Sequence, residues 1–326
     1  MNPPSTRVQR RPVHGVLLLD KPLGLSSNDA LQKAKWLLRA EKAGHTGTLD
    51  PLASGVLPLC FGAATKFSHL QLEANKTYQA RLKLGITTET GDAEGETLLR
   101  RDVLVDTAAI EAALQIFRGR IRQMPPMYSA LKKDGKPLYE YARLGLEVPR
   151  ETREIEILRL IRSSFPGRPE ALPDELDIEV ECSKGTYIRS LAIDIGEALG
   201  CGAHLSGLRR SASGQFNIER CIGLPELEAM PEAERLQQLL PVDALLAGLS
   251  AISLEAHEAG RFLSGLRRRG AWPDCAMTAV YGPPPTPGQN KTLLGAAHVA
   301  ANELIPDRLL NPQEIEQMNS TQSTPA

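Results

Sequence analysis

One aspartate stands at the end of a loop that is too rich in glycine and threonine to form a regular element. The predicted loop spans residues 44–55 and begins Gly-His-Thr-Gly-Thr-Leu-Asp-Pro, and the apolar run 56–61 follows it. Such a loop holds Asp50 close to a core, where an ionised carboxylate is costly unless it is paired. Asp50 is therefore a candidate nucleophile. The alternative is that it only bonds loop amides or begins the turn before Pro51.

A guanidinium is available to pair with this carboxylate. The pattern predicts a helix over about 187–199, closed by Gly200 at the usual C-terminal glycine position, so that Arg189 falls in the first turn. Pairing with Arg189 would keep Asp50 ionised and oriented while leaving it nucleophilic. The sequence does not show that the two meet, and an exposed surface position is the alternative for Arg189.

Other catalytic arrangements find little support. There is no G-x-S-x-G elbow, no phosphate-binding glycine loop and no C-x-x-C pair, and the six histidines are isolated from one another. The five scattered cysteines favour a reducing, cytoplasmic setting over a disulfide framework. We expect neither a metal nor another cofactor, and an aspartate nucleophile remains the best enzymatic hypothesis.

The elements around these residues can be predicted from periodicity and capping. Ser26 followed by Asp29 is typical of a capping box, and a helix should follow it. An apolar run predicts a short strand over 16–19, and alternation predicts two more over 78–84 and 176–182. Further helical segments are expected over 107–117 and over 225–246, the second with breaks at Pro231 and Pro241.

Charge is unevenly distributed in a chain of 326 residues whose net charge is only −1. Segment 118–153 carries nine basic and four acidic residues, and segment 259–270 carries four arginines and no acid. Local basic patches of this kind can follow a phosphate backbone, although solvated surface charge is the simpler alternative. No stretch is apolar enough to span a bilayer, so no membrane association is expected.

Several collinear motifs bring these segments together. They are GVLLLDKPLGLSS (15–27), GHTGTLDPLASGVLP (44–58), KTY (76–78), PPMYSALK (125–132), GKPLYEYARLG (135–145), SKGTYIRSL (183–191) and GCGAHLSGLRR (200–210). With these motifs the chain resembles the TruB-type family of bacterial tRNA pseudouridine-55 synthases over roughly residues 14–310. The resemblance implies an α+β fold. Its central mixed, largely antiparallel sheet is flanked by helices and loops, and a small C-terminal PUA-like β-barrel domain follows.

The resemblance also implies roles for individual residues. Asp50 matches the nucleophile, Arg189 the arginine paired with it, and Tyr78 the tyrosine that stacks on the target base and has been proposed as a base. Taken alone, Tyr78 would be interpreted as a core aromatic residue. The expected substrate-binding residues are His45, which fills the space left by the flipped nucleotide, Leu208, which forms an apolar wall of the uracil pocket, and Lys21, Tyr187, Lys132 and Arg143.

The same resemblance divides the chain. It implies a flexible basic tail (1–13), a catalytic domain (14–247) with an RNA-binding insertion (124–151), a PUA-like RNA-binding domain (248–312) and a disordered tail (313–326). The implied partner is tRNA, held at its T arm and acceptor stem. No obligate protein partner is expected, and the chain should act as a monomer.

The implied reaction turns a T-loop uridine into pseudouridine. Uracil is detached from C1′, rotated and rejoined through C5, so a carboxylate must activate either C6 of the base or C1′ of the sugar. Two alternatives remain. One is a protein that helps tRNA to fold by opening the T loop, a function that we expect to coexist with catalysis. The other is the guide-RNA-dependent relative of this family, which the short N-terminal tail and the insertion disfavour.

Overall fold

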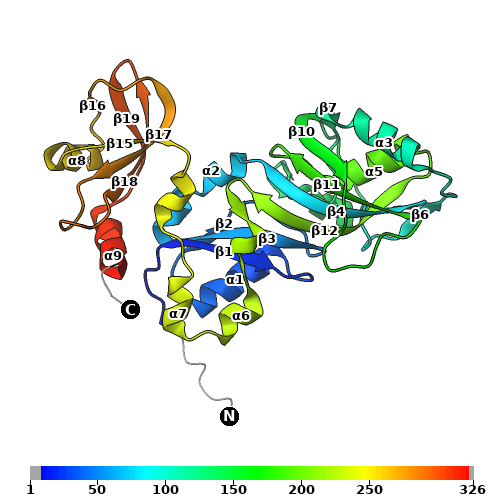
Figure 1. Ribbon diagram of the computed structural model, residues 1–326, viewed down its shortest axis with the longest axis horizontal. Helices are drawn as coiled ribbons and strands as arrows, with labels where there is room; N and C mark the ends of the chain where they lie inside the picture. The colour runs from blue at the N-terminus through cyan, green and yellow to red at the C-terminus, as the bar shows by residue number, and fades with distance from the viewer. Residues whose placement is uncertain (1–8, 323–326) are drawn as a thin grey trace, which may run out of the picture.

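Two β-sheets organise the protein. The structure is a computed structural model that describes residues 9–322. The larger sheet runs β14-β1-β3-β12-β4-β11-β10-β7, with β2 added beside β3 and β13 beside β12. The smaller sheet runs β15-β17-β18-β19-β16 and lies to one side of the first (Figure 1). The larger sheet is mixed but mostly antiparallel, because only β1·β14 and β12·β3 pair in parallel. The predicted fold class is confirmed.

The strands and helices of the described residues follow in chain order. The strands are β1 (Gly15–Lys21), β2 (Ala43–His45), β3 (Ala53–Phe61), β4 (Lys76–Leu84), β5 (Ile86–Thr88), β6 (Thr97–Arg100), β7 (Gly119–Gln123), β8 (Lys132–Lys133), β9 (Lys136–Pro137), β10 (Arg153–Arg162), β11 (Glu175–Cys182), β12 (Ala203–Ser213), β13 (Phe216–Asn217), β14 (Ile222–Gly223), β15 (Ser250–Ser253), β16 (Arg268–Arg269), β17 (Cys275–Gly282), β18 (Thr292–Ala300) and β19 (Glu303–Leu309). The helices are α1 (Ser27–Leu37), α2 (Ser68–Glu73), α3 (Thr107–Ile116), α4 (Leu138–Arg143), α5 (Ile188–Ala198), α6 (Leu224–Ala229), α7 (Glu232–Gln237), α8 (Ala256–Leu263) and α9 (Pro312–Gln322), with the 3₁₀ helices η1 (Gly62–Lys66), η2 (Ile218–Arg220) and η3 (Val242–Leu246).

Strands β1 and β3 are buried on both faces, which explains their continuous apolar runs. Leu17 and Leu19 belong to the core that α1 and α5 cover, whereas Val16 and Leu18 point the other way. This second face packs against η3 and against Ala279 and other residues of the smaller sheet, so a shared apolar cluster joins the two sheets. Alternation along β1 therefore directs one set of side chains into the core of the larger sheet and the other set into the cluster that joins the two sheets.

Both predicted tails need correction where the structure describes them. Residues 1–8 and 323–326 lie outside the described residues. Arg11 forms a parallel bridge with Ala40, and Val13 is buried, so the end of the expected N-terminal tail is part of the fold. The expected C-terminal tail instead forms α9. Asn311 and Glu314 cap it reciprocally at 2.7 and 2.8 Å, and residues of α9 pack on the apolar cluster between the sheets.

The glycine-rich segment also differs from its prediction. We expected a loop over 44–55, but β2 extends to His45 and β3 begins at Ala53. Pairing of β2 with β3 satisfies backbone groups that a longer loop would leave to water. The predicted strands and helices elsewhere are confirmed, including the Ser26 cap of α1, whose hydroxyl accepts from the Asp29 amide.

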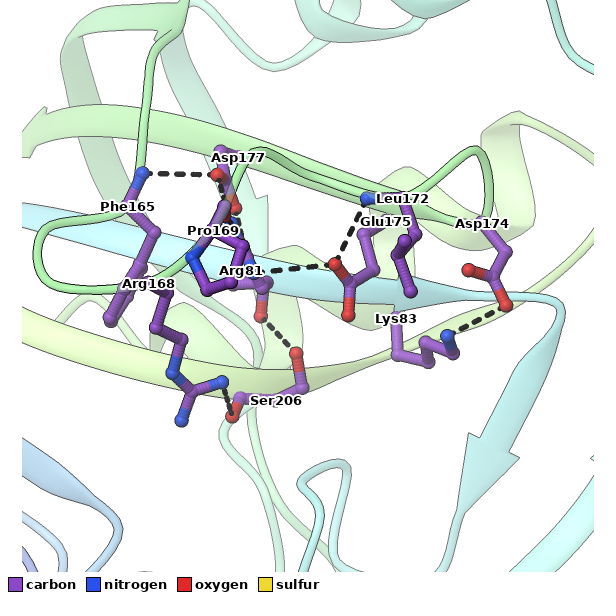
Figure 2. A network of polar contacts seen from close by, with 10 residues as sticks. All are labelled: Arg81, Lys83, Phe165, Arg168, Pro169, Leu172, Asp174, Glu175, Asp177 and Ser206. Carbon is purple, nitrogen blue, oxygen red and sulfur yellow. Dashed lines mark hydrogen bonds and ion pairs between the residues drawn. The ribbon is translucent and has the colours of Figure 1, made fainter.

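A buried ionic network holds the loop between β10 and β11 against the sheet. Figure 2 shows Arg81 of β4 surrounded by Asp177, Glu175 and the carbonyl of Pro169. The Arg81 and Asp177 side chains approach to 2.6 Å and are 5% and 4% exposed. Because β4 alternates, this network lies on the sheet face opposite to Tyr78.

Arg81→Met is expected to lower the free energy of unfolding by about 3–5 kcal/mol, because it leaves the Asp177 carboxylate buried without its guanidinium. Arg159→Met is the matched control. Arg159 is 55% exposed where it pairs with the half-buried Glu179, so the expected cost is below about 1 kcal/mol. Urea unfolding of both variants measures the difference, and equal costs would contradict the proposed role of the buried network.

Candidate active site

The loop that carries Asp50 is fixed on both sides of the aspartate. The buried Ser27 hydroxyl accepts from the Leu49 amide at 2.7 Å and donates to the Leu49 carbonyl at 3.0 Å. On the other side, the Gly24 amide donates to the Pro51 carbonyl at 2.8 Å. Both anchors come from the turn and helix that follow β1. The Lys-Pro-Leu-Gly-Leu-Ser-Ser sequence is therefore the support on which Asp50 is presented.

The Arg210 side chain fixes the first half of the same loop by a hydrogen bond to its backbone. It is almost fully buried, and its guanidinium donates to the carbonyls of Val56 at 2.7 Å and Gly47 at 3.1 Å. Gly47 has a φ of +82°, a left-handed conformation that favours glycine. A Cβ on Gly55 would overlap the Arg210 backbone. Gly47 thus allows the loop to turn beside the Arg210 guanidinium, and Gly55 allows β3 to approach the Arg210 backbone in β12.

Asp50 and Arg189 meet. Arg189 Nη2 lies 2.9 Å from Asp50 Oδ2, and the side chains are 7% and 42% exposed. The arginine reaches the loop because it stands in the first turn of α5, as the sequence predicted. The asymmetry in exposure has a chemical consequence: the guanidinium is held in the protein, whereas the carboxylate keeps one side open to a ligand.

Arg189 is itself held by groups that sequence reasoning missed. Its Nη1 lies 3.5 Å from Asp92 Oδ2 and donates to the Thr90 carbonyl at 3.2 Å, and its Nη2 donates to the Tyr128 carbonyl at 2.6 Å. Asp92 is buried and also accepts from the Glu94 amide. The guanidinium therefore bridges two carboxylates. Only Asp50 faces outward, so Asp92 orients the arginine.

Tyr78 and Leu208 lie on adjacent strands next to the aspartate loop. Tyr78 of β4 pairs in register with Arg210 of β12, and Leu208 pairs with Ala80 and with Ala53 of β3. Burial raises the pKa of the Tyr78 hydroxyl, an effect that the positive charge of Arg210 opposes. The phenol is consequently neutral near pH 7. Tyr78, Leu208 and Leu49 all belong to one apolar cluster.

His45 and Lys21 complete the surroundings of the loop. Burial lowers the pKa of His45, and the positive charge of Arg210 lowers it further, so both effects favour the neutral imidazole. Its Nδ1 is buried without a hydrogen-bond partner among residues 9–322. Burial lowers the pKa of Lys21 to about 8 against the pull of Asp50. The Lys21 ammonium donates to the carbonyls of Pro22 at 2.9 Å and Leu25 at 2.6 Å, so it supports the turn beneath Asp50.

The remaining predicted residues lie farther out. Tyr187 precedes α5. Burial raises the pKa of its hydroxyl, the charge of Arg189 lowers that pKa, and the charge of Asp50 raises it. Lys132 and Arg143 are exposed on the insertion between β7 and β10, Arg143 with its guanidinium 5.3 Å from the Tyr139 ring centroid. The structure thus groups Asp50, Arg189, Tyr78, Leu208, His45, Lys21 and Tyr187, and it places Lys132 and Arg143 on a separate arm.

Two absences apply to the part of the chain that the structure describes. No helix within 9–322 is long and apolar enough to cross a membrane. Over the same residues, no group of three or more histidine, cysteine, aspartate or glutamate side chains is arranged to hold a metal ion.

Solved structures define the class of fold. A chain of the archaeal box H/ACA sRNP Nop10–Cbf5 complex superposes with a TM-score of 0.67 at 22% identity, covering 94% of this chain and 88% of that one. A chain of a Cbf5–Nop10–Gar1 complex gives a TM-score of 0.67 at 25% identity, covering 93% and 86%. The fold is the pseudouridine synthase fold, and the five-stranded C-terminal sheet matches a PUA-like domain.

Sequence comparison then gives the family. The model for the TruB family pseudouridylate synthase N-terminal domain matches residues 35–188, and that for the tRNA pseudouridylate synthase B C-terminal domain matches 189–247. The tRNA pseudouridine synthase B of Verminephrobacter eiseniae is 58% identical over 98% of this chain and 96% of its own length. The protein of that name from Cupriavidus taiwanensis is 54% identical over 93% and 96%. The chain belongs to the TruB family of pseudouridylate synthases.

Proposed function

We propose that this protein converts one uridine in the T loop of tRNA, at position 55, to pseudouridine, with Asp50 as the nucleophile. The observation that carries the proposal is the Asp50 carboxylate, which is 42% exposed and paired at 2.9 Å with the buried Arg189. Relatives that share more than half of their residues with this chain bear the name tRNA pseudouridine synthase B. Their name supports tRNA as the substrate, and the site supports the chemistry.

The proposed reaction conserves every atom. The bond from N1 of uracil to C1′ breaks, the ring rotates, and a bond from C5 to C1′ forms. The proton at C5 is lost, and N1 gains one. Asp50 activates either C6 of the base or C1′ of the sugar, and its carboxylate is a good leaving group from both adducts. Arg189 holds that carboxylate in place through the 2.9 Å ion pair, and closure by RNA excludes the water that would otherwise release free uracil.

Flipping the nucleotide out of its loop costs a few kcal/mol, which Tyr78 can offset by stacking on the uracil. The raised pKa of Tyr78 favours this role, because a phenol acting as a base would first have to lose its proton. The imidazole of His45, whose neutral form burial favours and whose Nδ1 has no hydrogen-bond partner within the described residues, is suited to fill the space that the nucleotide leaves. Leu208 contributes an apolar wall to the same pocket.

The proposal is tested with a T-arm hairpin that carries tritium at C5 of its uridines. The purified chain, with no guide RNA or second protein added, should release one tritium per hairpin and none when the target uridine is replaced by cytidine. This outcome would also support a protein that acts without a guide RNA or a partner protein. We further propose that it acts as a monomer in the cytoplasm. Release that needs a guide RNA, or equal release from an anticodon arm, would contradict the proposed substrate.

The C-terminal arginines are proposed to hold phosphates of the tRNA. Arg267 and Arg269 both reach the Glu303 carboxylate, at 3.3 and 3.0 Å, so an incoming phosphate competes with that glutamate. Exchange of Arg267 and Arg269 for Gln should weaken tRNA binding. It should also reduce the slope of log affinity against log salt by about one for each phosphate that the variant no longer neutralises.

Glu303→Gln is the matched control for this prediction, since it frees both arginines and should strengthen binding. Affinities measured at several salt concentrations give the slopes. A slope that the double arginine exchange leaves unchanged would show that these arginines face solvent in the complex.

A further inference from the structure

The proposed RNA-binding insertion, the segment between β7 and β10, is attached beside the start of α5, the helix that carries Arg189. It leaves the sheet at the end of β7 and returns at the start of β10, where Gln123 and Arg153 pair in register. The Gln123 side chain is buried. Its Nε2 donates to the Tyr187 carbonyl at 3.0 Å, and its Oε1 accepts from the Tyr187 amide at 2.8 Å. The Gln123 side chain thus forms two hydrogen bonds with the backbone of Tyr187, as a neighbouring β-strand would, and ties the insertion to the residue that precedes α5.

The next residues of the insertion continue this attachment. The Met124 carbonyl accepts from the buried Ser190 hydroxyl at 2.9 Å. The Tyr128 carbonyl accepts from Arg189 at 2.6 Å. The root of the insertion therefore bonds to residues 187, 189 and 190, which form the start of the helix that carries the partner of Asp50.

A second segment closes the arrangement around the guanidinium. The Tyr128 hydroxyl donates to Glu89 at 3.0 Å, and the neighbouring Thr90 carbonyl accepts from Arg189 at 3.2 Å. The loop with Glu89 and Thr90 and the loop with Tyr128 are therefore hydrogen-bonded to each other, and both accept hydrogen bonds from Arg189. A displacement of residues 124–128 would change the donor directions of the guanidinium, and with them the direction in which the Asp50 carboxylate points.

We propose that Gln123 and Ser190 are positioning residues. When the insertion binds RNA, they couple its position to the geometry of the Asp50–Arg189 ion pair. The inference rests on the proposed function and adds a coupling within it. The insertion then serves two ends: its exposed arm binds RNA, and its root sets the geometry of the nucleophile. Loss of either positioning side chain should slow the chemical step more than it weakens RNA binding.

The test measures single-turnover tritium release at saturating T-arm RNA, together with the dissociation constant, for Gln123→Ala and Ser190→Ala. The rate should fall by about 10- to 100-fold, the effect of a small misplacement of reacting groups, while the dissociation constant changes by less than about threefold, a small part of the binding free energy. Ser190→Thr keeps the hydroxyl and should recover most of the rate. Gln32→Ala, an exposed glutamine on α1, controls for amide removal.

An unchanged rate, or a loss confined to binding, would overturn the coupling. A loss of rate that Ser190→Thr does not restore would also overturn it, because the effect would then not depend on the hydroxyl. If Gln123→Ala does not fold, the two Ser190 variants decide the matter alone. Wild-type protein that releases no tritium would instead refute the proposed function, so the two failures are distinguishable.

Discussion

Asp50→Asn is expected to lower the rate of tritium release by at least about four orders of magnitude, the scale on which removal of a nucleophile acts. The amide cannot form the covalent adduct, since it is far less nucleophilic than a carboxylate. It can still accept a hydrogen bond from Arg189, and the anchors at Leu49 and Pro51 do not involve the side chain. Folding and RNA affinity should therefore change little.

Asp102→Asn is the matched control, because Asp102 is an exposed aspartate in the segment between β6 and α3. Its rate should equal that of the wild type. Both variants are measured under single-turnover conditions at saturating RNA, with thermal unfolding and RNA affinity alongside. Release by Asp50→Asn within about a hundredfold of the wild-type rate, a deficit too small for a missing nucleophile, would remove Asp50 from that role.

Arg189→Met should damage both activity and stability, for separable reasons. Activity should fall by about 100-fold or more, because the carboxylate loses the donor that orients it. The free energy of unfolding should fall by about 3–5 kcal/mol, because the buried Asp92 carboxylate loses its partner. Arg189→Lys should retain part of the stability but little of the activity, since one ammonium cannot reproduce a guanidinium that bridges several groups.

The double variant Arg189→Met/Asp92→Asn separates the two effects. Without the buried negative charge, most of the missing stability should return, while tritium release stays low. Urea unfolding and single-turnover release, measured on the same preparations, give both quantities. Recovery of activity in the double variant would show that Arg189 serves only to neutralise Asp92.

Two residues of this site, Asp50 and Arg189, could be predicted from local patterns, whereas the other expected residues came only from the family resemblance. Asp50 stands in an unusual glycine-rich segment, and the capping pattern predicts the helix that carries Arg189. Asp92 gave no such signal, because it lies in an ordinary polar turn and gains its role only from the approach of α5. Arg210 was likewise missed. Its burial depends on the parallel pairing of β3 with β12, a long-range contact that periodicity does not encode.

The errors in the fold have similar physical causes. The segment that becomes α9 is polar enough to suggest disorder. Its helix depends on the reciprocal Asn311–Glu314 cap and on an ion pair at 2.6 Å between Glu314 and Lys66, a residue far away in sequence. The strand β2 is only three residues long and contains Gly44, and it forms because β3 offers an edge to pair with. In both places tertiary contacts overrode a weak local preference.

A crystal structure of the Asp50→Asn protein bound to T-arm RNA would examine the mechanism most directly. It should show one uridine turned out of its loop, its base lying against the Tyr78 ring, and C1′ or C6 in van der Waals contact with the side chain at position 50. A target nucleotide still stacked inside the loop, or held on the protein with that side chain out of reach of both carbons, would contradict catalysis by Asp50.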